Sequence, residues 1–268
     1  MSTYNAIQHH ARATAGFDGR VAHALALLRE AAEDHPGSVV QASSLGVEGM
    51  VLTDLIARHR LPIAVATLDT GKLHAETLAL LPAIEERYGL KVEVHRPRRE
   101  AVMHFVGRHG ELPMRRSVEL RQACCALRKV EPMQRLLAGR TAWVSGLRRE
   151  QSETRADTPL RETAPDGREK FYPLADWSLQ DIWHYVELHD VPYNVLHDRH
   201  HPSIGCEPCT RAVALGEDER AGRWWWEDDT AKECGLHQRP AVTALGHEGA
   251  AFGIDAVDAE RVTEPAAA

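Results

Sequence analysis

The fold is decided by the stretch Ser38-Val39-Val40-Gln41-Ala42-Ser43-Ser44-Leu45-Gly46-Val47-Glu48. Its first six residues form a short β-branched run that predicts a strand, and the small residues from Ser43 to Gly46 predict a tight loop. Apolar residues then recur at helical spacing from Met50 to Ile56, so a helix begins just after Gly46. The stretch therefore predicts a strand, a small-residue loop and a helix in direct succession.

The same alternation of helix and strand continues on both sides of this stretch. We expect helices over 21–32, 73–88 and 125–137, strands over 63–68, 90–95 and 141–146, and a further helix that begins at a capping box of Ser178 and Asp181. Residues 190–201 are predicted to form a loop. Strands that alternate with helices at this spacing predict an α/β fold, with a mostly parallel twisted sheet, right-handed crossovers and flanking helices.

Composition excludes several classes of protein. The 268 residues are 43% hydrophobic and 26% charged, which is ordinary for a soluble globular chain and not for a disordered one. No apolar run approaches the roughly 18 residues of a spanning helix, and the N-terminus lacks the features of a signal peptide, so we expect a cytoplasmic protein. The net charge of −7 disfavours nucleic acid and membrane surfaces as partners.

The chain is predicted to form one α/β domain over 1–237. Residues 238–268 are rich in Ala and Gly with weak periodicity, and we expect a partly disordered C-terminal extension. The sequence leaves the oligomeric state open, a homo-oligomer included.

Two turns are expected at the carboxyl edge of the sheet, where open α/β sheets bind ligands. The first is the loop Ser43–Glu48, whose backbone N–H groups and following helix dipole suit an anion. The second is Leu68-Asp69-Thr70-Gly71, after the next strand. Either turn alone also occurs in α/β proteins without a ligand, but two on one edge favour a binding site.

The five cysteines predict a metal site rather than disulfides, because the count is odd and no export signal is present. Cys124 and Cys125 are adjacent, Cys206 and Cys209 form a CxxC, and Cys234 stands alone. Four thiolates suit a tetrahedral zinc or a [4Fe–4S] cluster, and the adjacent pair disfavours zinc. The alternative is that the pair is only a set of small buried residues.

Basic residues gather near these motifs although the chain is acidic overall. They are Arg128, Lys129, Arg148, Arg149, Arg155, Arg220 and Arg223. Such clustering suggests a dianion held by guanidinium groups, and the alternative is a solvated charged face. The run Trp224-Trp225-Trp226 is more typical of a core than of a binding platform, and we expect a functional role for one of the three.

In combination these motifs resemble the assimilatory adenylyl-sulfate (APS) reductase family. The resemblance rests on Ser44-Leu45-Gly46-Val47-Glu48, Leu68-Asp69-Thr70-Gly71, Cys124–Val130, Gly146–Ser152, Pro202–Arg211, Glu217–Trp226 and Lys232–His237, and it spans about 38–237. The related 3′-phospho-APS (PAPS) reductases share the tail Glu233–His237 but lack the four paired cysteines, so their presence here favours APS. Two residues depart from the family pattern: Gly49 stands where Asp is usual, and Lys72 where Arg is common.

The resemblance implies an adenosine-nucleotide α-hydrolase-like (PP-loop type) fold with a mobile C-terminal segment and a [4Fe–4S] cluster. It implies thioredoxin-dependent, or glutaredoxin-dependent, reduction of APS to sulfite and AMP, in sulfate assimilation and cysteine biosynthesis. Cys234 is the expected nucleophile, through an S-sulfocysteine, and Cys124, Cys125, Cys206 and Cys209 are the expected cluster ligands. The candidate substrate-binding residues are Ser43, Ser44, Gly46, Leu68, Asp69, Thr70, Gly71, Lys129, Arg148, Arg155, Arg220, Arg223 and His237.

Three rival functions remain open at this point. A PAPS reductase is the nearest, an ATP-using tRNA thiolase with a similar loop is more distant, and a zinc-stapled RNA-binding module is a non-enzymatic alternative. The acidic net charge disfavours the two alternatives that bind RNA, the tRNA thiolase and the RNA-binding module.

Overall fold

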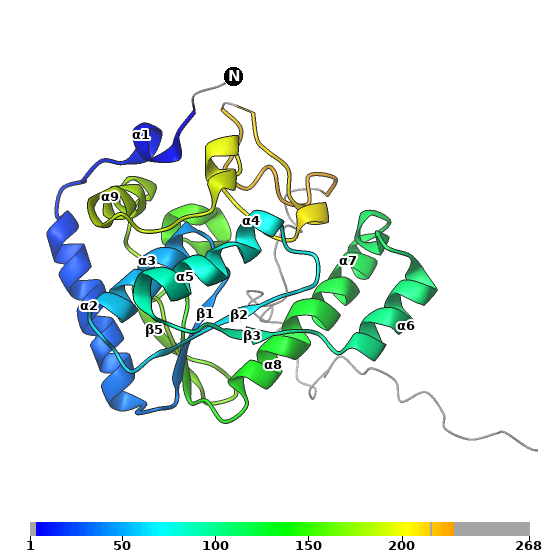
Figure 1. Cartoon of the computed structure of the whole chain (residues 1–268), viewed down its shortest axis with the longest axis horizontal. Helices are drawn as coiled ribbons and strands as arrows, with labels where there is room; N and C mark the ends of the chain where they lie inside the picture. Colours follow the sequence, from blue (N-terminus) through cyan, green and yellow to red (C-terminus); the bar gives the residue numbers. More distant parts are fainter. Residues whose placement is uncertain (1–3, 215, 228–268) are drawn as a thin grey trace, which may run out of the picture. The chain divides into compact units, whose positions relative to one another are not determined.

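The computed structural model describes residues 4–214 and 216–227 of the chain. In this part of the chain six strands form one sheet, in the order β3-β2-β1-β4-β6-β5 (Figure 1). The strands are β1 (Val39–Ser43), β2 (Ala64–Leu68), β3 (Glu93–His95), β4 (Ala142–Val144), β5 (Arg161–Thr163) and β6 (Glu169–Phe171). All neighbours pair in parallel except β5, which is antiparallel to β6. The mostly parallel α/β sheet predicted from the sequence is confirmed.

Helices occupy most of the connections between the strands. They are α1 (Ala6–His10), α2 (Phe17–Asp34), α3 (Val47–Arg58), α4 (Ala75–Leu78), α5 (Leu80–Tyr88), α6 (Arg99–His109), α7 (Val118–Cys125), α8 (Glu131–Leu137) and α9 (Leu179–His189). The predicted capping box opens α9, because the Ser178 hydroxyl accepts from the Asp181 N–H and the Asp181 carboxylate accepts from the Ser178 N–H. Gly89 ends α5 in the left-handed conformation, with φ of 63°.

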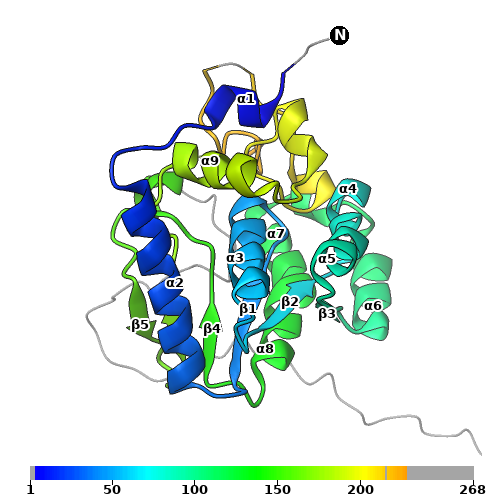
Figure 2. The ribbon, with the colours of Figure 1, turned by 60° about the vertical axis from the view of Figure 1, so that its left-hand side comes forward.

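Side chains that alternate along the strands build two apolar layers, one on each face of the sheet. Val39 of β1 packs in the larger core with α2, α3, α5 and α9, whereas Val40 faces α8 together with Trp143 of β4. In Figure 2, α2 and α3 lie in front of the strands and α8 lies behind them. Both faces of the central strands are therefore covered, as a parallel sheet requires.

The strand order places a topological switch beside β1. The chain runs from β1 outward to β2 and β3, and then returns to β4 on the opposite side of β1. Ligands of open α/β sheets bind outside the carboxyl ends of the strands at such a point. The loop that follows β1 and the turns that follow β2 and β4 meet at this edge of the sheet.

Several elements differ from the sequence-based expectation. The helix expected over 73–88 is two helices, α4 and α5, that meet at Ala79. The predicted loop 190–201 contains the short 3-10 helix Val195–Arg199. The helices α1, α6 and α7 and the strands β5 and β6 were not predicted, and the helix expected over 125–137 is a π-helical turn followed by α8. No helix in the described part of the chain combines the length and apolarity that crossing a membrane requires.

Candidate active site

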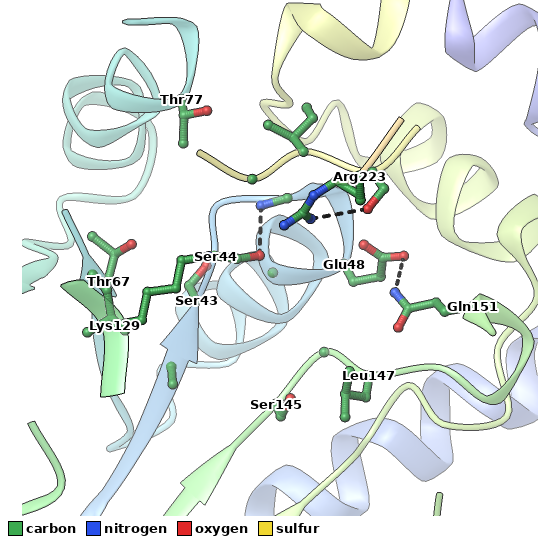
Figure 3. Close-up of a pocket in the computed structure, with 18 of the residues that line it drawn as sticks. Ser43, Ser44, Glu48, Thr67, Thr77, Lys129, Ser145, Leu147, Gln151 and Arg223 are labelled. Atoms are coloured by element: carbon green, nitrogen blue, oxygen red, sulfur yellow. Dashed lines mark hydrogen bonds between the residues drawn. The ribbon is translucent and has the colours of Figure 1, made fainter. Parts of the chain in front are cut away.

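A cavity of about 230 Å³ lies at the carboxyl ends of β1, β2 and β4 (Figure 3). Its wall includes Ser43 and Ser44 after β1, Thr70 after β2, and Ser145 and Gly146 after β4. The two turns predicted at this edge thus border one space. Ser145 and Gly146 were missed in the sequence analysis, although the rule that identified the other two turns applies to them as well.

The cavity wall has three chemically different parts. One part is apolar and is formed by Ala42, Ala66, Leu68, Met133, Leu136 and Trp143 from the strands and α8. A second part carries the cations Lys129, Arg155, Arg220 and Arg223. A third part carries Glu48, Gln151, His197 and Glu219. In Figure 3, Glu48 and Gln151 lie across the cavity from Lys129 and Thr67.

The loop after β1 is closed by its own serine side chains. The Ser43 hydroxyl accepts from the Leu45 N–H at 3.1 Å, and the Ser44 hydroxyl accepts from the Gly46 N–H at 3.4 Å. Turns of this kind form when a hydroxyl replaces a backbone acceptor two residues away. These two N–H groups, which the sequence analysis assigned to an anion, therefore contact serine oxygens, and the start of α3 at Val47 supplies the positive helix end.

A buried ion pair braces this loop against the segment that follows β4. Arg148 Nε lies 3.0 Å from Glu48 Oε1, and Gln151 donates to the same oxygen at 2.9 Å. Burial alone would raise the pKa of Glu48, but the Arg148 guanidinium and these hydrogen bonds hold it below its usual value. Arg155 Nη1 in turn donates to Gln151 Oε1 at 2.6 Å. Glu48 is thus an ionised acceptor at the cavity wall.

Not every candidate substrate residue lines the cavity. Ser43, Ser44, Gly46, Leu68, Thr70, Lys129, Arg155, Arg220 and Arg223 do. Arg148 instead faces Glu48, and the Asp69 carboxylate accepts from the Gly71 N–H and pairs with Arg96 at 2.9 Å. These three residues, Asp69, Gly71 and Arg148, shape the turns rather than the described cavity surface. Cys234 and His237 lie outside the described residues.

Removing Arg148 is expected to destabilise the fold. Arg148→Met leaves Glu48 as an unpaired buried charge, which costs about 3–5 kcal/mol, whereas the double variant Glu48→Gln/Arg148→Met removes both charges and should lose less. Urea unfolding measures the two free energies. A loss below about 1 kcal/mol in Arg148→Met, the size expected for an exposed pair, would contradict a structural role for this ion pair.

The four paired cysteines lie around a second, smaller cavity. Cys124 and Cys125 stand at the end of α7, while Cys206 directly precedes the short 3-10 helix Glu207–Cys209 and Cys209 is its last residue. Among the described residues, no three His, Cys, Asp or Glu side chains converge on the position of a single metal ion. Four thiols around one cavity are the kind and number of donor that a [4Fe–4S] cluster or a tetrahedral zinc requires.

Burial and nearby charge act in opposite directions on these thiols. Burial raises the pKa of Cys209 to about 11 and raises the pKa of Cys124, while the Arg128 guanidinium opposes the rise at Cys124. The Thr70 hydroxyl lies 3.2 Å from Cys206 Sγ. Cations and a hydroxyl beside the sulfurs are the surroundings that an anionic thiolate set requires.

One segment joins the two cavities. Arg128 Nη1 donates to the Thr70 carbonyl at 2.8 Å, and the Glu207 N–H donates to the Lys72 carbonyl at 2.8 Å. The turn after β2 therefore contacts both segments that carry a cysteine pair. Lys129, Arg223 and Trp224 line both cavities.

A π-helical turn, Ala126–Val130, separates α7 from α8 and carries Arg128 and Lys129. Such turns are rare and frequent at functional sites, because the extra residue per turn changes where the following side chains lie. Sequence periodicity gave no signal for it. It places the cysteine pair beside one cavity and Lys129 at the border between the two.

Arg223 is buried beside the same border. Its guanidinium lies over the Trp224 ring at 4.6 Å, and its Nη1 donates to the Ser203 hydroxyl at 3.4 Å. Its Nε is buried without a hydrogen-bond partner among the described residues. A Cβ at Gly205 would overlap this guanidinium and displace it, so glycine allows the close approach.

Of the three tryptophans, Trp224 is the one that lies in both cavity walls. It is 1% exposed and packs with the cysteines, whereas Trp225 is 36% exposed. Trp224 is therefore a core residue between the two cavities, and the expectation that one of the three tryptophans has a function stays a prediction. His197 and Glu219, by contrast, were missed, because an isolated histidine in a loop and a glutamate in a charged run carry no pattern that distinguishes them.

Comparison with known proteins agrees with the resemblance stated above. Residues 38–212 match the family model described as the phosphoadenosine phosphosulfate reductase domain. The adenosine 5'-phosphosulfate reductase of Allochromatium vinosum is 55% identical over 203 residues, which are 75% of this chain and 79% of the relative. That of Burkholderia cepacia is 52% identical over 215 residues, or 79% of this chain and 85% of the relative.

Two solved structures are similar in fold. A phosphoadenylyl-sulfate reductase from Candida auris superimposes with a TM-score of 0.61 at 25% identity, over 76% of this chain and 100% of that chain. An FMN adenylyltransferase from Candida glabrata gives a TM-score of 0.51 at 14% identity, over 85% and 82%, which is a likeness of fold alone. The chain therefore belongs to the phosphoadenosine phosphosulfate reductase family and is an enzyme of its adenosine 5'-phosphosulfate reductase group.

Proposed function

We propose that this enzyme reduces APS to sulfite and AMP with electrons from thioredoxin, through an S-sulfo intermediate on Cys234. The observation that carries the proposal is the shared wall of the two cavities, where Lys129 and Arg223 face both a nucleotide-sized space and the cysteine set. Relatives that are 52–55% identical carry the name adenosine 5'-phosphosulfate reductase.

The cavity offers a place for each part of APS. The apolar wall with Trp143 and Met133 suits the adenine ring, and the cationic wall suits the phosphosulfate. Lys129, Arg220 and Arg223 then neutralise the dianion, which an incoming thiolate would otherwise repel. These cations also stabilise the negative charge that develops on the departing AMP.

The reaction balances as two displacements at sulfur. The Cys234 thiolate attacks the sulfate sulfur, an S–S bond forms, the S–O bond to AMP breaks, and AMP leaves with the electron pair. A thioredoxin thiolate next attacks Cys234 Sγ and releases sulfite with the electron pair of the broken S–S bond. The second thioredoxin thiol then resolves the mixed disulfide. Thioredoxin is oxidised to its disulfide, the substrate sulfur is reduced, and the Cys234 thiol is restored.

Cys124, Cys125, Cys206 and Cys209 are the residues that would hold a [4Fe–4S] cluster. When bound, this group would connect the two segments that carry the cysteine pairs and so support the fold beside the anion site. Lys129 lines both cavities, so its ammonium group lies between the cysteine set and the substrate space.

The proposal places the enzyme in the cytoplasm, where thioredoxin or glutaredoxin keeps thiols reduced. The boundary at Gln238 and the tail beyond it remain predictions, since residues 228–268 lie outside the described part of the chain.

A competition assay tests the proposed substrate. APS and PAPS are supplied together at equal concentration with reduced thioredoxin, and AMP and 3′-phospho-AMP are quantified as the two leaving groups. We expect AMP to dominate. A dominant 3′-phospho-AMP would favour the PAPS reductase alternative, and no sulfite from either substrate would contradict both assignments.

Arg223→Ala is expected to weaken use of APS strongly. Removing a buried cation from a desolvated dianion costs about 2–5 kcal/mol, which is at least about 30-fold in kcat/KM. The control variant is Arg168→Ala, in the turn between β5 and β6. It also removes one arginine, but away from the cavities, so kcat/KM should stay unchanged. Equal kinetics for the two variants would show that Arg223 has no role in substrate binding.

A further inference from the structure

His197 has a buried ring nitrogen that nothing in the described protein satisfies. The residue is 4% exposed, and its Nε2 has no hydrogen-bond partner in the described part of the chain. Buried polar atoms are nearly always paired, and leaving one unpaired costs about 1–3 kcal/mol. His197 lines the 230 Å³ cavity and also a neighbouring cavity of about 140 Å³, so a ligand bound in the larger one is a candidate for the missing partner.

The surrounding structure fixes the ring in this position. The Asn194 side-chain oxygen accepts from the backbone N–H of Leu196 at 3.0 Å, and the Asn194 backbone carbonyl accepts from the backbone N–H of His197 at 3.0 Å. Trp183 packs edge-on against the imidazole with 5.2 Å between ring centroids. The ring thus lies between a capped 3-10 turn and an aromatic neighbour.

The imidazole is neutral at physiological pH. Burial lowers the pKa of His197 to about 4, although the Glu48 carboxylate partly opposes this shift. A neutral imidazole has one N–H donor and one unprotonated nitrogen that accepts, so Nε2 offers a single directional hydrogen bond and no charge. This chemistry suits a hydroxyl group better than a phosphate or sulfate.

The neighbours of His197 in the cavity wall select the same kind of ligand. Glu48, Gln151 and Glu219 share this wall, and burial raises the pKa of Glu219 while Arg148, 3.9 Å from its carboxylate, opposes the rise. Carboxylate oxygens accept from hydroxyls and repel anions. In Figure 3, Lys129 lies across the cavity from Glu48 and Gln151, whereas Arg223 lies on their side of it.

We propose that Nε2 of His197 forms a hydrogen bond with a ribose hydroxyl of the adenosine nucleotide. The inference rests on the proposed function, which supplies a nucleotide whose base and phosphosulfate occupy the apolar and cationic walls. With the base and the phosphosulfate assigned to the other two walls, the hydroxyl groups of the ribose are left. We assign them to the wall formed by Glu48, His197 and Glu219. His197 is therefore a substrate-binding residue that sets the position of the sugar.

Binding of AMP, 2′-deoxy-AMP and 3′-deoxy-AMP to the full chain, measured by titration calorimetry, tests this contact. The wild-type protein should bind AMP about 10-fold more tightly than one of the two deoxy analogues. His197→Phe keeps the ring shape but removes both nitrogens, so it should bind AMP about 10-fold more weakly and lose that discrimination. His197→Gln places a polar atom near the position of Nε2, so it should recover part of the discrimination between AMP and the deoxy analogue.

The outcomes separate the contact from the function. Wild-type protein that binds AMP and both deoxy analogues equally would overturn the role of His197, whatever the variants do. The same discrimination in His197→Phe as in wild type would also overturn it. Wild-type protein that binds none of the three nucleotides would instead contradict the nucleotide site itself, and with it the proposed function.

Discussion

Cys206→Ser is expected to lose most of its bound iron and to lower sulfite formation by roughly 100-fold or more, since one of four thiolates is removed from a closed site. Cys206 lines the cysteine cavity and bridges to the turn after β2 through Leu73, so the loss should also loosen that turn. Iron analysis, the visible absorbance of the cluster and an APS assay on the same preparation measure the effect. Cys125→Ser should behave alike.

The control for this prediction is Cys234→Ser, which removes a thiol outside the four-cysteine set. Full iron content in either Cys206→Ser or Cys125→Ser would contradict the ligand assignment. Zinc at one equivalent, with no iron in wild-type protein purified without oxygen, would favour the zinc alternative.

Cys234→Ser is expected to keep its iron and its affinity for AMP while turnover falls by about 1,000-fold or more, because a nucleophile that forms the covalent intermediate has no substitute. The reason is positional. Cys234 is the one cysteine without a partner in a motif, and Lys232, Gly235 and His237 flank it. Positive neighbours favour the thiolate.

Iron content and AMP binding thus distinguish a variant of a cluster ligand, which should lose iron, from a variant of the nucleophile, which should keep both. Turnover that survives in Cys234→Ser, with iron and AMP affinity unchanged, would show that another residue attacks the substrate.

The central fold could be predicted because its strands are buried on both faces. The strands observed as β1 to β4 lie within the predicted ranges, and each follows or precedes a helix with a clear apolar face. The edge strand β5 and its neighbour β6 were missed because they have three residues each and β5 exposes Arg161 and Thr163. The helix α6 was missed although Val102, Phe105 and Val106 recur at helical spacing, and this stripe is only half-buried.

The place of the site was predictable, and the orientation of some of its side chains was not. The carboxyl-edge rule located Ser43 and Thr70, and cysteine spacing brought together the four thiols that the structure groups around one cavity. Whether Arg148 faces a ligand or Glu48 depends on tertiary contacts that no local pattern encodes. The same holds for His197, whose burial follows from the packing of Trp183 and a 3-10 turn.

The most direct test of the account is mass spectrometry of wild-type protein incubated with APS in the absence of thioredoxin. The account predicts a sulfonate adduct on the peptide that contains Cys234, one equivalent of released AMP, and loss of the adduct as sulfite when reduced thioredoxin is added. An adduct on Cys206 or Cys209, or sulfite formation without any adduct on Cys234, would contradict it.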